Sequence, residues 1–463
     1  MSTVNESKKW EAMASGCWRD SQMSKRNRVV FLSALVCLAG AVAVAQTASS
    51  VPPCPGYNPA NNTNLACELA TGFRAPANIT VNNTQAAQGQ SFNPVVLSAT
   101  LATQLSSLPV ATAVSGTGIT FINGIPTFSN ESLGTILTQR GDTIGRHRFF
   151  VSFNYQRFGF GSIDGARFKE LDTVNQVTYP NVGTSYVVGK NNIDFNVDQY
   201  TALATFGLTS RIDLTLIVPF STVNLSLVSS ANQFNVSCGD QTKCNPPNSL
   251  LSSFSLGTIN LPGSKSGPGD VTISLKGNVF KKENGLSMGV GTELRMNTGD
   301  ETNYLGTGAY GVKPYMILSH RGKRFTPNMN IGYQWNSTSS LYTDKNGQHL
   351  NLPSSFLYSG GADFRVLPRL TLVGEFIGQY VINGPRLQQS TVQIPGQGTF
   401  KSIVVTDATG NQITSSYAID NAGFGFKINL YKGFLVTASA LFKLDDAGLR
   451  AKWVPLVGVS YRF

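Results

Sequence analysis

From Arg146 to the C-terminus, apolar and polar residues alternate with a period of two. Residues 149–155 place Phe149, Val151, Phe153 and Tyr155 in one phase and polar residues mostly in the other. Side chains of a strand point alternately to opposite faces, so this pattern predicts half-buried strands, about twelve of them with membrane-spanning length. Further apolar faces begin near Ile212, Val271, Leu286, Phe325, Phe356, Leu370, Phe424, Phe434 and Trp453, and weaker runs lie near 195–208 and 309–320.

The connections between these strands alternate between short and long. This alternation predicts an all-β fold, a transmembrane antiparallel up-and-down β-barrel whose short turns face the periplasm. A membrane requires such closure, because an open sheet leaves backbone groups without partners. The predicted short turns lie at 209–210, 281–284, 321–323, 367–368 and 431–433, and the longer polar connections lie near 161–193, 228–267, 297–308, 337–354, 383–415 and 445–451.

Composition agrees with a barrel and disfavours a helical membrane protein. Only 13% of the 463 residues are charged, 46 are glycine, and the mean hydropathy is −0.04. No apolar run long enough for a membrane helix follows Ala45. Of the formal net charge of +11, three charges belong to residues 1–45. The remaining basic residues are scattered, which disfavours nucleic acid and suggests contact with anionic lipopolysaccharide or an anion-favouring lumen.

Residues 1–45 have the features of a secretory signal peptide. An apolar run over 29–45 follows Lys25, Arg26 and Arg28, and Ala43-Val44-Ala45 fits a small-x-small cleavage site. The cleavage motif disfavours the alternative of an N-terminal anchor helix. Translation from Met23 instead of Met1 would give a signal peptide of more usual length. Export and the barrel pattern together predict the outer membrane of a Gram-negative-type bacterium.

Four cysteines remain after cleavage, and an oxidising periplasm favours disulfides between them. Their order predicts two local pairs, Cys54 with Cys67 and Cys238 with Cys244. The spacings do not match a zinc site and the chain has only three histidines, so we expect no metal and no cofactor.

Residues 46–140 form a region distinct from the barrel of residues 141–463. They are rich in Asn, Thr, Ala, Ser and Gln, they are almost uncharged, and they alternate poorly. Three interpretations stay open: a small periplasmic domain, a plug in the lumen, or a loosely ordered extension, the last being slightly favoured over a plug. Within the region, residues 131–138 could form a short helix capped by Ser129 or Asn130.

The phase opposite to the apolar faces predicts which side chains point into the lumen. Mixed charges there fit a hydrated channel and fit equally a closed interior of paired salt bridges. A barrel of twelve strands is wider than barrels of about eight strands, whose interior is filled by side chains, and narrower than open porins of about sixteen. We therefore favour a narrow conducting lumen. The charged residues predicted to face inward are Arg148, Lys276, Glu293, Arg295, Asp363, Arg365, Glu375, Lys427 and Lys443.

Two aspartates are predicted to meet at the external rim. Asp270 opens one strand and Asp300 follows the next, so counting outwards from the intervening turn places them near each other. Such a pair could bind a divalent cation or gate the mouth. The simpler interpretation, which we favour, is a pair of Gly-Asp turns that end the strands.

Several of these motifs resemble a known family. Gly269-Asp270 with its strand, 297–300 (Asn-Thr-Gly-Asp), and 206–220 with its Val218-Pro219-Phe220 look like the MetA-pathway phenol-degradation family of outer-membrane transporters, which usually has Pro where Asn297 stands here. The resemblance covers roughly residues 140–463. It implies a barrel that moves small molecules, hydrophobic or aromatic compounds among them. The terminal Phe463 resembles the signal that such barrels present to their insertion machinery.

The favoured function is therefore an outer-membrane channel or transporter for passive movement of small molecules. One alternative is a structural or surface-binding barrel without transport. A lipid-modifying enzyme is disfavoured because His147 and His320 map to the periplasmic side, and His349 has no clear acid–serine arrangement beside it.

Overall fold

The computed structural model describes the chain in two parts. Before the barrel it describes residues 64–72, 88–90, 95–106, 108, 119–122 and 125–128. From 133 to 462 it describes all residues except 180, 243, 245, 283–284, 323, 345, 408–410 and 432. The predicted signal peptide, Cys54 and Phe463 lie outside the described residues.

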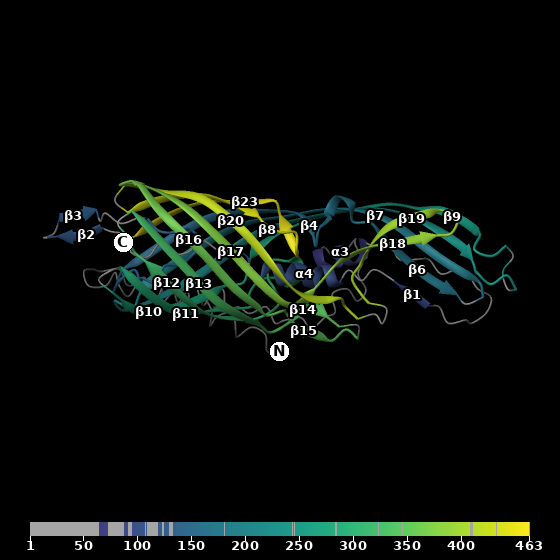
Figure 1. Cartoon of the computed structure of the whole chain (residues 1–463), viewed down its shortest axis with the longest axis horizontal. Helices are drawn as coiled ribbons and strands as arrows, with labels where there is room; N and C mark the ends of the chain where they lie inside the picture. Colours follow the sequence, from purple (N-terminus) through teal and green to yellow (C-terminus); the bar gives the residue numbers. More distant parts are fainter. Residues whose placement is uncertain are drawn as a thin grey trace, which may run out of the picture. The chain divides into compact units, whose positions relative to one another are not determined.

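Twelve antiparallel strands form a closed barrel within this described part (Figure 1), which confirms the predicted fold class and strand number. The last strand pairs with the first, for example Leu456 with Gln156 and Tyr461 with Val151, so the barrel sheet has no open edge within the membrane. The strands are β4 (Phe149–Ile163), β7 (Gly183–Gly207), β8 (Ile212–Ser237), β10 (Thr272–Lys281), β11 (Leu286–Arg295), β12 (Gly311–His320), β13 (Phe325–Asn336), β16 (Ser355–Leu367), β17 (Leu370–Pro385), β20 (Thr414–Tyr431), β21 (Phe434–Lys443) and β23 (Trp453–Arg462).

The five short turns lie where the sequence predicted them. They join β7 to β8, β10 to β11, β12 to β13, β16 to β17 and β20 to β21, and all lie at one end of the barrel. In outer-membrane barrels this end faces the periplasm. We call the opposite end the external end.

The two faces of each strand differ as a membrane requires. On β4, Phe153 is 61% exposed, whereas Ser152, Asn154 and Gln156 are buried. Large apolar side chains on the other strands are exposed in the same outward phase, for example Met329 and Phe424. Outside a bilayer such a surface would be unstable, so the outward face is the lipid-facing one.

The predictions of long loops at 161–193 and 228–267 are wrong, because strands occupy most of both segments. β7 and β8 run for 25 and 26 residues, and β9 (Leu250–Pro268) continues along β8 outside the membrane. Shorter external elements complete this part: β5 (Ala166–Arg167), the 3-10 helix η1 (Phe168–Glu170), β6 (Thr173–Tyr179), the 3-10 helix η2 (Glu301–Asn303), the hairpins β14 (Thr338–Thr343) with β15 (His349–Asn351) and β18 (Gln388–Ile394) with β19 (Gly398–Val404), and β22 (Leu449–Ala451).

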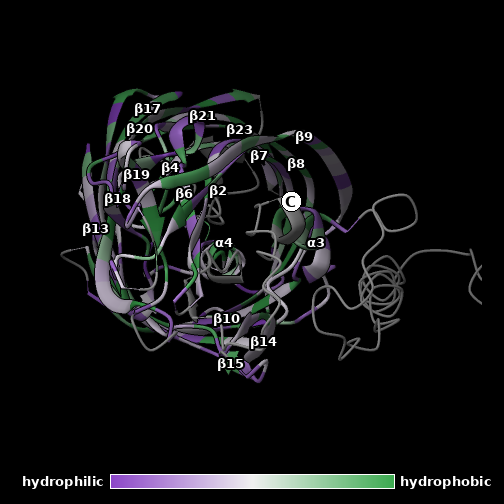
Figure 2. Cartoon of the chain, turned by 90° about the vertical axis from the view of Figure 1, so that its right-hand side faces the viewer, coloured by the Kyte–Doolittle hydropathy of each residue, from purple (hydrophilic) through white to green (hydrophobic). Residues whose placement is uncertain are grey.

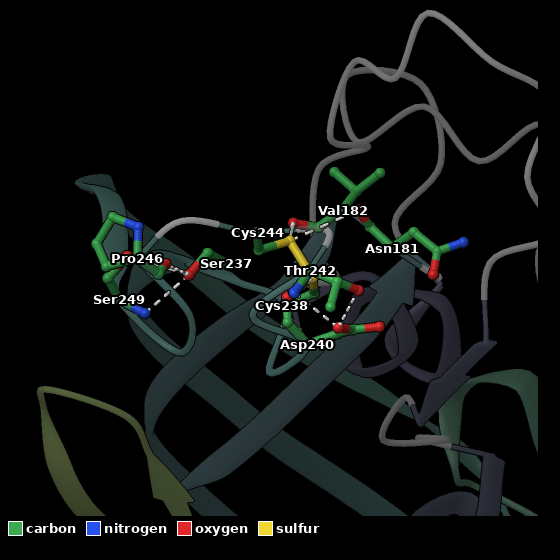
Figure 3. Close-up of a disulfide and its surroundings, with 9 residues drawn as sticks. All are labelled: Asn181, Val182, Ser237, Cys238, Asp240, Thr242, Cys244, Pro246 and Ser249. Carbon is green, nitrogen blue, oxygen red and sulfur yellow. Dashed lines mark hydrogen bonds between the residues drawn. A yellow bond between two sulfur atoms is a disulfide. The ribbon is translucent and has the colours of Figure 1, made fainter.

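At the external end, the disulfide Cys238–Cys244 closes the loop between β8 and β9 (Figure 3), which confirms this predicted pair. Thr242 donates hydrogen bonds to Asp240 within the loop. The partner of the other predicted pair, Cys54, lies outside the described residues.

Helices from the N-terminal region pack inside the external half of the barrel. Helix α4 (Val95–Leu105) lies within the ring of strands (Figure 2), and α3 (Leu65–Gly72) contacts β8, β9 and η2. Their buried residues, among them Leu65 and Leu101, share one hydrophobic core with residues of the external loops such as Tyr304. Two further N-terminal elements are β1 (Gln88–Gln90), which pairs with β6, and the hairpin of β2 (Ile119–Ile122) and β3 (Ile125–Phe128). None of the described helices is long and apolar enough to cross a membrane.

Candidate functional site

The lumen near the periplasmic end contains residues 133–145, which we call the strap. The strap was predicted to be helical over 131–138, and this prediction is wrong, because residues 136–138 form a bend. The Ile136, Leu137 and Thr138 amides all donate to the Glu375 carboxylate, at 3.2, 2.9 and 2.7 Å. A helix would orient these amides along its axis, so the buried carboxylate on β17 favours the bend.

Opposite charges fix the middle of the strap. The Arg140 guanidinium lies 2.7 Å from both oxygens of Asp363, and both side chains are almost fully buried. The ammonium of Lys276 donates to the Arg140 and Asp142 carbonyls at 3.3 and 2.9 Å. That ammonium also lies 3.7 Å from the Asp213 carboxylate.

Both ends of the strap are held as well. At one end, Lys427 donates to the Thr135 carbonyl at 2.5 Å and the Leu133 amide donates to Thr371. At the other end, the Ile144 amide donates to Asp213. The strap therefore crosses the lumen from β17 to β8 and contacts strands in between.

Asp142 joins the strap to the periplasmic turns. Its carboxylate lies 2.5 Å from Arg321 and 3.3 Å from Lys281. Burial opposes ionisation of this carboxyl, but the charges and hydrogen bonds of Arg321 and Lys281 outweigh burial, so the pKa of Asp142 lies below its ordinary value. The ion pairs therefore stabilise the bound strap fully above the ordinary pKa of about 3.9.

Acidification is expected to loosen the strap at this point. As the pH falls below about 3.9 and through the lowered pKa of Asp142, the stabilisation is progressively lost. Channel open time should rise in wild type as the pH falls below about 3.9. In Asp142→Asn it should already be raised at neutral pH and change less over the same range. An identical pH profile in both proteins would contradict this role of Asp142.

The structure gives the nine predicted lumen-facing charges different surroundings. Five of them contact the strap directly through their side chains: Lys276, Glu293, Asp363, Glu375 and Lys427. Glu293 accepts a hydrogen bond from Gln139 of the strap and pairs with Lys313. Of the other four, Arg295 binds the Ser106 carbonyl after α4, and Lys443 pairs with Asp446 at the external end. Arg148 and Arg365 are half-buried near the periplasmic end, and the Arg148 amide donates to the Gly145 carbonyl of the strap at 3.3 Å.

Sequence reasoning missed the strap's own charged residues, Arg140 and Asp142, and also Asp213, which accepts from the Ile144 amide of the strap. Asp213 lies in the polar phase of β8, so the alternation itself could have identified it. Nothing in the local sequence marks residues 133–145 as a segment that binds inside the barrel.

Asp270 and Asp300 anchor the loop between β11 and β12. Asp270 is buried and accepts from the Gly299 amide at 3.0 Å and from the Thr307 amide and hydroxyl. Asp300 accepts from Thr302 and Asn303 and so caps η2. Both carboxylates are thus used by loop donors, as expected for turns that end strands. In the described residues no cluster of acidic, His or Cys side chains could hold a metal ion.

Above the strap, the lumen retains a cavity of about 340 Å³. On one side its lining is largely apolar and comes from neighbouring strands β21, β23, β4 and β7. The opposite side, from β10 to β13, is polar. The apolar side includes Phe158, Phe160, Val197, Leu203, Leu441 and Val454, and the polar side includes Lys276, Glu293, Arg295, Lys313, Tyr315 and Gln334.

The charged groups that line this cavity are largely paired with one another. Glu293 pairs with Lys313, Lys276 lies near Asp213, and Arg295 lies 3.8 Å from Asp270. The polar wall therefore has little net charge of either sign. A cavity of this size and mixed lining suits a small organic molecule rather than a stream of ions.

A closed twelve-stranded barrel with an apolar outer face and short turns at one end defines the protein as an outer-membrane β-barrel. The family model described as "Putative MetA-pathway of phenol degradation" matches residues 179–463, and the chain belongs to this family. The match confirms the resemblance that the strand motifs indicated.

Comparison with solved structures found matches of low sequence identity that cover about 70% of this chain or more. The COG4313 outer membrane channel from Pseudomonas putida F1 is 14% identical, with a TM-score of 0.40 over 70% of this chain and 97% of that one. A Pseudomonas aeruginosa FadL homologue is 10% identical, with a TM-score of 0.28 over 77% and 99%. The CymD monoaromatic hydrocarbon channel is 10% identical, with a TM-score of 0.31 over 69% and 88%. No curated protein matches the chain.

Proposed function

We propose that the protein is a passive outer-membrane channel for small, largely apolar molecules, hydrophobic or aromatic compounds among them. The observation that carries the proposal is the lumenal cavity with an apolar wall opposite a polar wall. An apolar solute can desolvate against the first wall while polar substituents keep partners on the second. Membership of a family described by phenol degradation is in keeping with this solute class, because phenol is a small aromatic compound.

The proposal includes a role for the N-terminal region as a plug. The strap crosses the lumen at the periplasmic end, and α4 lies in the external half. A solute that reaches the cavity can then leave to the periplasm only when the strap moves. Of the three interpretations of this region, the plug accounts best for the buried charges that hold the strap.

Other roles have less support. An anion-selective pore is disfavoured because the lumenal charges are largely paired. An enzyme is disfavoured because His320 ends β12 at the periplasmic end, whereas His349 lies in an exposed external hairpin. We also propose lipopolysaccharide contact at the outer face, and recognition by the insertion machinery through Phe463.

A reversible cross-link tests whether the strap must move. A β-carbon at Gly141 would lie 2.7 Å from Ser287 Oγ on β11, which is compatible with a disulfide between Gly141→Cys and Ser287→Cys. When oxidised, this double variant should lose protein-dependent uptake of a small aromatic probe such as toluene into outer-membrane vesicles, whose lipopolysaccharide leaflet slows diffusion of apolar molecules through the lipid itself. Reduction should restore uptake to the wild-type rate.

Each single-cysteine variant and the wild type, with and without reductant, serve as controls. They separate the effect of the cross-link from reduction of the native Cys238–Cys244 disulfide. Unchanged uptake in the oxidised double variant would exclude strap movement as a required step. Absence of uptake from every form, reduced or oxidised, would reject the channel and favour a structural barrel.

A further inference from the structure

Three polar side chains on the apolar wall of the lumen lack hydrogen-bond partners among the described residues. The buried atoms without a partner are both amide atoms of Gln156, the amide oxygen of Gln199 and the hydroxyl of Thr201. Their residues are 1%, 8% and 2% exposed. Buried polar groups normally have partners, so a group of three without them on one wall is unusual.

The register brings these groups together. Gln156 on β4 lies directly opposite Gln199 on β7, and Thr201 follows two residues later on the same inner face. On the other side of Gln156, across the strand pair with β23, lies Leu456, which is 1% exposed. The three residues thus form one small polar patch shared by two neighbouring strands.

The patch reaches the cavity through Gln199 and has apolar surroundings. Gln199 lines the cavity together with Phe158, Val197 and Leu203. Along their full described lengths, β4 and β7 place no charged residue on the inner face. Most of the charged residues that line the cavity lie between β8 and β12. Arg450 on β22, which also lines it, lies 3.6 Å from the Asp445 carboxylate.

We propose that Gln156, Gln199 and Thr201 form a hydrogen-bonding subsite for an uncharged solute that has an apolar body and one group able both to donate and to accept. A primary amide or an alcohol has this chemistry. The glutamine amide can match either, because it carries two donor hydrogens and an acceptor oxygen. This inference rests on the proposed channel function and specifies the chemistry of its solute.

The same wall should reject the ionised analogue of such a solute. No charged group of β4 or β7 lies on it to neutralise a carboxylate, and desolvation of an unpaired charge is far more costly than that of an amide. The subsite should equally discriminate against a purely apolar molecule of the same size. That molecule would form no hydrogen bond with these polar atoms, whereas an amide or an alcohol would.

Three probes that share one ring test this ranking: benzamide, toluene and benzoate. Binding to the full-length protein in detergent micelles would be measured by isothermal titration calorimetry at neutral pH, with protein-free micelles as the blank. Benzamide should bind at least about fivefold more tightly than toluene, as expected for a single net hydrogen bond. Benzoate should bind most weakly.

Substitutions then assign the preference to these residues. Gln199→Leu and Gln156→Leu should bring the benzamide-to-toluene ratio close to one while leaving toluene binding intact, and Thr201→Val should reduce the ratio with little change in volume. The matched control is Gln379→Leu, because Gln379 is also a buried lumenal glutamine, but its amide donates to Ser355 at 2.9 Å. This control should retain the wild-type ratio.

The outcomes separate the subsite from the channel. Equal binding of benzamide and toluene by wild type, or an unchanged ratio in all three variants, would overturn the subsite while leaving the channel intact. The subsite is also rejected if Gln379→Leu lowers the ratio as much as Gln199→Leu does. If no probe binds and no form shows uptake in the cross-linking experiment, the channel function itself fails.

Discussion

Replacing Glu375 with leucine is expected to raise the ratio of open to closed time of single channels about a hundredfold or more. The carboxylate accepts from three consecutive strap amides, and hydrogen bonds to charged groups contribute about 1.5–3 kcal/mol each. Leucine fills similar space but accepts none of them. Conductance recordings in planar bilayers would measure the change directly.

Gln379→Leu is the control for this experiment, because Gln379 lies on the same strand and contacts Ser355 rather than the strap. Its ratio should stay near that of wild type. A Glu375→Leu channel that remains as closed as wild type would show that this carboxylate does not retain the strap.

Replacing Asp363 with alanine should release the strap by a different route. Arg140 would then keep a buried charge without its carboxylate partner, and loss of one member of a buried pair costs about 3–5 kcal/mol. The strap can avoid this cost by leaving the lumen. A thiol placed by Ile144→Cys, at a position that is 1% exposed, should then react at least about a hundredfold faster with a water-soluble reagent.

The double variant Arg140→Met with Asp363→Leu provides the matched comparison. It removes both charges and keeps an apolar contact, so most of the protection of the thiol should return. If labelling of Asp363→Ala is as slow as in the parent, the ion pair does not hold the strap. If the double variant labels as fast as Asp363→Ala, a buried unpaired charge is not the cause.

The barrel was predictable because the membrane imposes a strong pattern. Each spanning strand must present apolar residues to lipid on one face, so residues such as Phe153 and Met329 mark the phase. Outside the membrane this constraint ends. β8 continues to Ser237 with polar residues on its outward face and was therefore interpreted as a loop from residue 228.

The site was only half predictable for a related reason. The lumenal charges follow from strand phase, and the residues that contact the strap, such as Glu375 and Lys427, were among those predicted. The strap binds these side chains mainly through its backbone amides and carbonyls. Almost every residue has these groups, so no sequence motif reveals them. The same absence of a side-chain signal explains the mistaken helix over 131–138.

The position of the strap has a consequence for assembly. The strap precedes β4 in the chain, yet its binding groups lie on β8, β10, β11, β12, β16, β17 and β20, all synthesised later. The barrel is completed only when β23 pairs with β4. Before that step the sheet is open and the strap can contact several strands at once. The strap can thus act as an internal template that curves the sheet and brings its two edges toward closure.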